Sequence, residues 1–154
     1  MSKDDRYLVQ DEGTCCFVYA VANCLIYFGL PVPDLEEAFD IALCRHGGTI
    51  KHQDVVDYMK APLEPVGDYN LVLDKGGVLN ISHPIWNGHC LFCYPSKRTY
   101  VTIINSWLGP NVVEVGREEI EQFVPPLHNF GKYWAVVRND RSQKDVEKVE
   151  RIWS

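Results

Sequence analysis

Two short segments, far apart in the sequence, contain the side chains that a cysteine nucleophile needs. The first carries Gln10 and, six positions later, Cys16 at the head of an apolar stretch. The second carries His89 and, sixteen positions later, Asn105. They supply a thiol, an imidazole, a carboxamide that can orient the imidazole, and an amide that can face a developing oxyanion. This combination of groups predicts nucleophilic catalysis through a covalent thioester.

The first segment predicts an activated thiol at the start of a helix. Residues 16–28 are apolar on nearly all sides, which indicates a buried helix, and Thr14 before them is a suitable N-cap. A thiol in the first turn lies near unpaired N–H groups and the positive end of the helix dipole, and both favour the thiolate. The Gln10 amide and the Cys16 N–H would then form an oxyanion hole. Two alternatives stay open: the adjacent Cys15 as nucleophile, or ordinary core thiols.

The second segment predicts an imidazole that is held by a neighbouring strand. Residues 90–94 and 100–105 read as the strands of a hairpin, so the start of one lies opposite the end of the other. His89 and Asn105 would then be cross-strand neighbours, and the Asn105 carbonyl could fix the tautomer and rotamer of the imidazole. The alternative is that His89 is a turn histidine at a sheet edge.

The remaining pattern predicts an α+β fold, with helices first and an antiparallel sheet after them. We expect helices over residues 16–28, 35–44, 52–59 and 117–123, and strands over 69–73, 78–81, 90–94, 100–105, 111–115 and 133–137. The length fits one compact domain spanning residues 1–154, in which residues 141–154 form a C-terminal helix or a charged tail that could bind a partner.

Composition excludes several classes of protein. The net charge of −6, without a basic cluster, argues against nucleic-acid binding, and no stretch of about 18 apolar residues predicts a membrane span. Cys90 and Cys93 form a single C-x-x-C pair whose members face opposite sides of a strand, so we expect no metal site and no cofactor. His46, His52 and His128 are expected at the surface or in loops. The oligomeric state is left open.

Taken together, the chain resembles the papain-like cysteine peptidases over residues 10–107. The resemblance rests on the spacing of Gln10 and Cys16, on the spacing of His89 and Asn105, and on the triplet at 105–107, which reads Asn-Ser-Trp. The first segment is also similar to the leader peptidase domains of bacteriocin transporters, including the Tyr-Phe-Gly that ends its helix at residues 27–29. The resemblance implies a papain-like fold, in which a helical half with a buried nucleophile helix packs on a β-sheet half.

The resemblance also implies a role for each matched residue. Cys16 rather than Cys15 would be the nucleophile, His89 the general base and acid, Asn105 the residue that orients His89, and Gln10 part of the oxyanion hole. The residues implied to bind substrate are Gly47, Gly48, Gly88 and Trp107. Gly48 would offer its backbone to an extended peptide, and Trp107 would cover the contact between His89 and Asn105.

Departures from the family indicate a small version without a propeptide. Phe17 follows the nucleophile where the family usually has Trp, and Gly13 stands where secreted members have a disulfide cysteine, so Cys44 would stay a thiol. The sequence shows no propeptide or signal peptide, which favours a cytoplasmic protein, or one of the host cytoplasm if it is viral. We therefore expect a thiol hydrolase that cleaves peptide or isopeptide bonds. The alternative is a catalytically silent papain-fold module that binds a peptide or protein.

Overall fold

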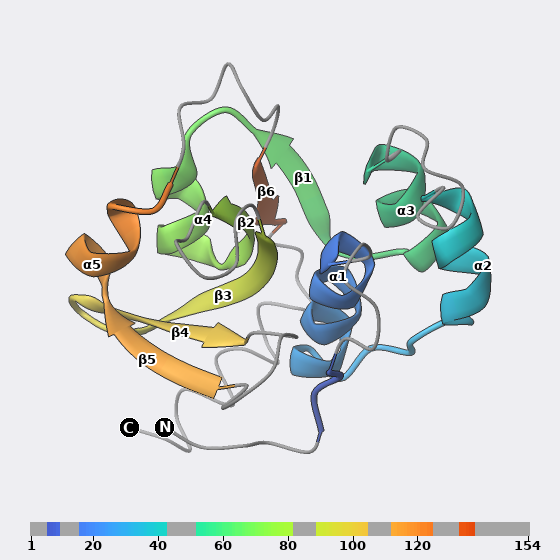
Figure 1. Cartoon of the computed structure of the whole chain (residues 1–154), viewed down its shortest axis with the longest axis horizontal. Helices are drawn as coiled ribbons and strands as arrows, with labels where there is room; N and C mark the ends of the chain where they lie inside the picture. Colours follow the sequence, from blue (N-terminus) through green and yellow to red (C-terminus); the bar gives the residue numbers. More distant parts are fainter. Residues whose placement is uncertain are drawn as a thin grey trace.

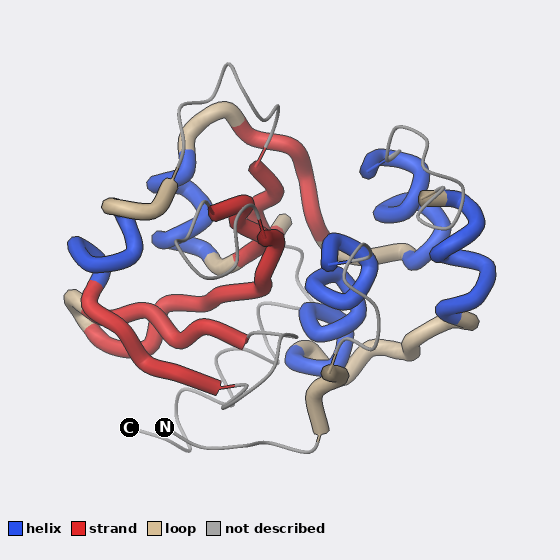
Figure 2. Tube along the Cα trace, viewed as in Figure 1, coloured by secondary structure: helices blue, strands red, loops and turns tan. Residues whose placement is uncertain are grey.

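The computed structural model describes residues 6–9, 16–42, 52–81, 89–104, 112–124 and 133–137. Five helices lie in these ranges: α1 (Cys16–Tyr27), α2 (Leu35–Ile41), α3 (His52–Met59), α4 (Tyr69–Lys75) and α5 (Arg117–Glu121). The strands in these ranges are β1 (Leu63–Val66), β2 (Gly77–Ile81), β3 (His89–Lys97), β4 (Tyr100–Ile104), β5 (Val112–Gly116) and β6 (Tyr133–Val136). The expected α+β class is confirmed (Figures 1 and 2).

The strands form one antiparallel sheet in the order β1-β6-β2-β3-β4-β5. The predicted hairpin between β3 and β4 is confirmed, with Phe92 opposite Ile104 and a register shift between Pro95 and Lys97. Helices α1, α2 and α3 lie on one side of the sheet, and α4 and α5 lie on the other (Figure 1). The sheet therefore separates two layers of helices.

Each face of the sheet has its own core. Along β3, Cys90 and Phe92 belong to the core that contains α1, whereas Leu91 and Cys93 belong to the core that contains α4 and α5. This alternation is the two-residue period of a strand that is covered on both faces. The same alternation separates Cys90 from Cys93, and the described residues hold no group of ligands that fits a metal ion.

Helix α1, which begins with the predicted nucleophile, is the most deeply buried helix of the described chain. Its residues from Phe17 to Leu25 are all buried, and it packs against β3, α2 and α3. Gly29 ends it with a φ of 69°, while the Leu30 N–H donates to the Leu25 carbonyl at 2.9 Å. Glycine adopts this left-handed conformation without the Cβ clash, which explains why the helix ends there.

Two expectations about the elements are wrong. Residues 69–73 form helix α4 rather than a strand, because Asp68 accepts from the Asn70 N–H at 2.9 Å and so caps the helix. Strand β1 was missing from the expected elements, and it contains Pro65. The proline is tolerated because β1 lies at the edge of the sheet, where a strand can lack one N–H donor.

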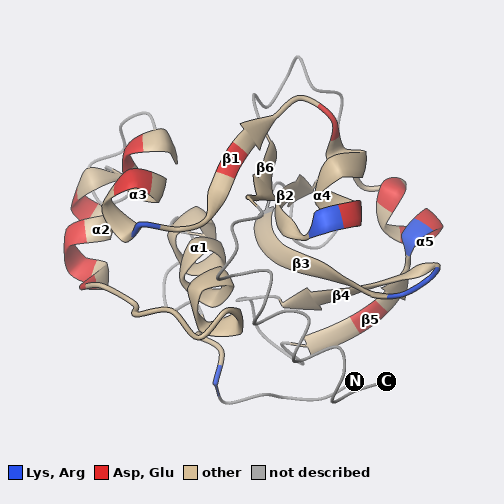
Figure 3. Cartoon of the chain, turned by 180° about the vertical axis from the view of Figure 1, so that it is seen from behind, with Lys and Arg blue, Asp and Glu red and all other residues tan. Residues whose placement is uncertain are grey.

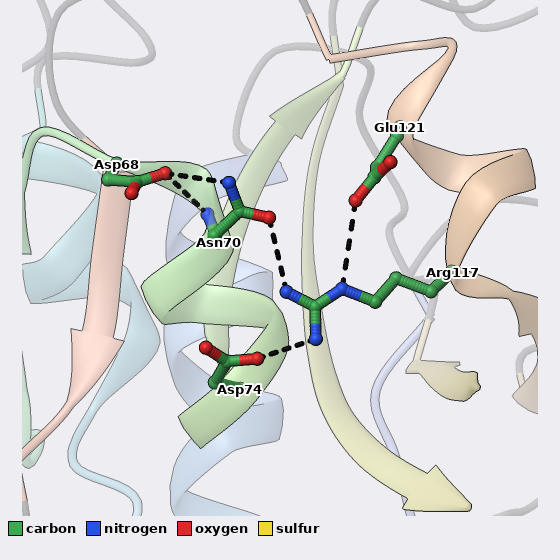
Figure 4. Close-up of polar contacts among 5 residues, drawn as sticks. All are labelled: Asp68, Asn70, Asp74, Arg117 and Glu121. Carbon is green, nitrogen blue, oxygen red and sulfur yellow. Dashed lines mark hydrogen bonds and ion pairs between the residues drawn. The ribbon is translucent and has the colours of Figure 1, made fainter. Parts of the chain in front are cut away.

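A polar cluster fastens α5 to α4 on the far side of the sheet (Figure 4). The Arg117 guanidinium forms an ion pair with Asp74, donates to the Asn70 side chain at 3.1 Å, and lies 3.6 Å from a Glu121 carboxylate oxygen. The planar guanidinium group of Arg117 therefore links acceptors on α4 and α5.

Acidic residues gather on the outer helices α2 and α3 (Figure 3). Those on α2 are Glu36, Glu37 and Asp40, and those on α3 are Asp54 and Asp57. The first two suit the positive end of the α2 dipole, where Asp34 caps the helix as expected. Within the described ranges, no helix is long and apolar enough to cross a membrane.

Candidate functional site

The predicted nucleophile occupies the first position of the buried helix. Cys16 begins α1 and is half-buried, while the residues that follow it are in the core. Its side chain therefore lies at the helix N-terminus, where the unpaired N–H groups of the first turn favour a negative charge. The structure thus confirms the position of Cys16 on the helix; its catalytic role stays a prediction.

The start of strand β3 lies directly against this thiol. The Cys90 N–H donates a hydrogen bond to the Cys16 Sγ at 3.4 Å, although the two residues are 74 positions apart in the sequence. His89 precedes Cys90 and is the first residue of the strand, paired with Ile81 of β2. The two segments that carry the predicted chemistry therefore meet in space. The side chain of His89 lies outside the described residues.

Strand β4 ends close to the same place. Its last residue, Ile104, pairs with Phe92, which is three residues along β3 from His89. Asn105 follows Ile104 directly in the sequence and lies outside the described residues, so its predicted contact with His89 stays a prediction. The hairpin does bring the strand that precedes Asn105 to the end of β3 that meets Cys16.

The other predicted site residues lie outside the described ranges. They are Gln10, Gly47, Gly48, Gly88 and Trp107. The segment before Gln10 is nevertheless held in place, because the buried Asn23 side chain accepts from the Leu8 N–H at 2.8 Å and donates to the Leu8 carbonyl at 3.3 Å. Leu8 is two residues before Gln10, and Asn23 lies on α1, the helix that begins with Cys16.

His52, which was expected at the surface or in a loop, lies close enough to Cys16 to interact with its charge. His52 begins α3, is half-buried, and stacks on the Phe17 ring with a centroid distance of 4.0 Å. Burial lowers the pKa of His52, while the charge of the neighbouring Cys16 opposes that shift. The sequence did carry a signal: Val55, Val56 and Met59 are the buried face of α3, and His52 shares that face at helical spacing.

The other three thiols in the described part of the chain are poor nucleophiles because they are buried. Burial raises the pKa of Cys93 to about 12 and raises that of Cys24 further. The pKa of Cys90 is raised well above its ordinary value, first by a hydrogen bond with the Cys16 side chain and then by burial and by the charge of Cys16. A high pKa keeps these groups protonated at neutral pH, so Cys16 has no thiolate competitor among them.

Comparison with known proteins supports the fold. No family model and no curated protein matches the chain. Among solved structures, it is similar to the peptidase domain of Streptococcus ComA, a bi-functional ABC transporter involved in a quorum sensing pathway. That match has a TM-score of 0.63 and 12% identity, and covers 86% of this chain and 97% of that domain.

A second solved structure is a double glycine motif protease from an AMS/PCAT transporter, in complex with the leader peptide. It matches with a TM-score of 0.57 and 18% identity, over 84% of this chain and 88% of that one. The chain therefore has the papain-like α+β fold of these peptidase domains. Both matches are transporter peptidases, so they support the leader-peptidase resemblance and give no support to a small papain-like enzyme without a propeptide.

Proposed function

We propose that this protein is a cysteine peptidase that cleaves peptides through an acyl-enzyme on Cys16. The observation that carries the proposal is the hydrogen bond from the Cys90 N–H to the Cys16 Sγ, because it places the start of the His89 strand against the thiol. A half-buried thiol at a helix N-terminus, next to a strand that begins with histidine, is the arrangement that nucleophilic thiol catalysis needs.

In the proposed reaction, the Cys16 thiolate attacks the scissile carbonyl and forms a tetrahedral oxyanion. The Cys16 N–H and the Gln10 side chain donate to that oxyanion, and His89, oriented by Asn105, gives a proton to the leaving amine. Water then hydrolyses the thioester, with His89 as general base. Gln10, His89 and Asn105 enter this scheme through the sequence resemblance, and the cytoplasmic location also stays a prediction.

The proposed substrate is an extended peptide with a double-glycine motif. Support comes from the second structural neighbour, a double glycine motif protease that was solved with its leader peptide. A narrow cleft that accepts backbone without side chains would select glycine, because only glycine lets another chain approach so closely. Isopeptide cleavage by the same thioester chemistry is an extension of this proposal.

The test is incubation of the full chain with a synthetic peptide that contains Gly-Gly, followed by mass spectrometry of the products. We expect one cleavage near the Gly-Gly, none in a matched Ala-Ala peptide, and a loss of more than about a thousandfold in Cys16→Ala. Cys15→Ala should keep substantial activity. Cleavage that survives Cys16→Ala but not Cys15→Ala would move the nucleophile by one residue, and binding without any cleavage would favour the silent peptide-binding module.

A further inference from the structure

Cys90 lies against Cys16 at the start of helix α1. The Cys90 N–H donates to the Cys16 Sγ at 3.4 Å, and Cys16 packs against the same core cluster that contains the Cys90 side chain. A hydrogen bond with the Cys16 side chain is also the first cause of the raised pKa of Cys90. Cys90 is 8% exposed, on the face of β3 that packs on α1, whereas Cys16 is half-buried. A second thiol, that of Cys90, therefore lies on the core side of the proposed nucleophile.

We propose that Cys90 is a resolving cysteine, which captures oxidised Cys16 as a Cys16–Cys90 disulfide and so switches the nucleophile off reversibly. The proposal rests on the proposed function only in what the switch controls, namely the peptidase. The disulfide itself requires the contact between the two side chains and the greater reactivity of Cys16.

The two thiols differ in a way that fixes the order of events. Cys16 is the more exposed and lies at a helix N-terminus, so it meets a small oxidant first. Cys90 stays protonated because its pKa is raised by the hydrogen bond to Cys16, by burial and by the charge of Cys16. Oxidation of Cys16 removes its negative charge, and Cys90 then becomes easier to deprotonate. The resolving thiol is thus held inactive until its partner is oxidised.

With hydrogen peroxide as the oxidant, the chemistry balances in two steps. The Cys16 thiolate attacks a peroxide oxygen, the O–O bond breaks, and protonation of the leaving hydroxide gives a sulfenic acid and water. The Cys90 sulfur then attacks the Cys16 sulfur, so that an S–S bond forms and the S–O bond breaks. The leaving hydroxide takes the Cys90 proton as water. Overall, two thiols lose two hydrogens, and one peroxide becomes two waters.

The other described cysteines cannot take this role. Cys93 lies on the same strand but faces the opposite core, and Cys24 is fully buried further along α1. Cys93 therefore offers a matched control: it is a buried cysteine on the same strand as Cys90, but on the opposite face of the sheet.

The experiment treats the full chain with a several-fold molar excess of hydrogen peroxide and then measures iodoacetamide labelling of Cys16 before and after dithiothreitol. We expect a loss of two hydrogens, fragment spectra that assign a Cys16–Cys90 bond, and near-complete recovery of the label on reduction. Cys93→Ala should behave in the same way. In Cys90→Ala, Cys16 should pass on to the sulfinic and sulfonic acids, and dithiothreitol should not restore the label.

The proposal is overturned if Cys16 pairs with Cys15 instead, or if Cys90→Ala recovers the Cys16 label as fully as the unaltered chain. Circular dichroism of Cys90→Ala checks that the variant is folded. Because the readouts are mass and labelling rather than peptide cleavage, failure of the peptidase assay leaves this result intact. Conversely, if the chain cleaves peptides but forms no Cys16–Cys90 disulfide, the redox switch is refuted and the proposed peptidase function is not.

Discussion

Asn23 on helix α1 forms hydrogen bonds with both backbone polar groups of Leu8, over a sequence separation of 15 residues. Its side-chain carbonyl accepts from the Leu8 N–H, and its amide donates to the Leu8 carbonyl. This is the pairing that a neighbouring strand would make, supplied here by one fully buried side chain. The relationship fastens the segment before Gln10 to the helix that begins with Cys16.

We therefore expect Asn23→Ala to destabilise the protein and to impair catalysis. The change leaves a donor and an acceptor of Leu8 without partners, which costs about 1–3 kcal/mol of unfolding free energy. Chemical denaturation measures this loss, and peptide cleavage should fall further than the folded fraction alone explains. A variant with unchanged stability and rate would show that Asn23 does not position the segment.

Gly77 allows β2 and β6 to approach closely, and we expect Gly77→Ala to be severely destabilising. Its φ is 150°, and an added Cβ would lie 2.0 Å from the Trp134 carbonyl oxygen. The expected loss is about 3 kcal/mol or more, because backbone atoms have to move. Gly67→Ala is the matched control, since an added Cβ there meets nothing within 4 Å. Equal thermal stability of the two variants would refute this account.

The lowered pKa of His52 predicts a pH-dependent stability. The unfolded chain binds the proton more readily than the folded one, so the unfolding free energy falls as the pH drops below the ordinary histidine value of about 6.5. His52→Phe keeps a ring on Phe17 and removes the titrating group. Urea denaturation between about pH 7 and 5 should therefore show a flatter dependence in the variant. Parallel curves for the two proteins would contradict the burial of His52.

Asn105→Ala tests whether the residue after β4 orients His89. We expect the rate of peptide cleavage to fall by about 10–100-fold, because the imidazole loses the partner that fixes its tautomer. The unfolding free energy should change by less than about 1 kcal/mol. Asn105→Asp, which retains an acceptor, should restore part of the rate. Loss of folding in Asn105→Ala would make the residue structural instead.

Arg117→Lys tests the polar cluster between α4 and α5. The Lys ammonium group cannot contact Asp74, Asn70 and Glu121 at the same time, as the Arg117 guanidinium does. We therefore expect the unfolding free energy to fall by about 1 kcal/mol. Arg98→Lys, in the exposed turn between β3 and β4, should change it by less than about 0.5 kcal/mol. High salt screens the ion pairs of Arg117, so it should reduce the difference in unfolding free energy between the two variants.

The sequence predicted the long, strongly patterned elements well. Helix α1 and the β3–β4 hairpin were expected because an all-round apolar run and two strands at hairpin spacing have few other interpretations. Residues 69–73 misled the prediction because Tyr69, Leu71 and Leu73 alternate as in a strand. In the structure, Asp68 caps a helix there, and the adjacent Val72 and Leu73 are both buried. The helix cap at Asp68 therefore determined the local structure, rather than the alternation of apolar residues.

At the site, the sequence identified the thiol and the strand that meets it, but it missed His52 and the contact with Cys90. Both omissions have one physical reason. His52 approaches Cys16 from α3 and Cys90 approaches it from β3, and both approaches depend on how the elements pack rather than on spacing along the chain. The position of His52 on the same helical face as Val55, Val56 and Met59 could have predicted its burial. No local pattern in the sequence predicts the contact between Cys16 and Cys90.

The alternation along β3 also limits how this protein can evolve. Cys90 and Phe92 belong to one core and Leu91 and Cys93 to the other, so an inserted or deleted residue among them would exchange the two sets and mispack both cores. The turn at 98–99 is free of this packing constraint, since its residues are exposed. Descendants of this chain can therefore lengthen the hairpin tip freely, while the part of the strand beside the thiol must keep its length.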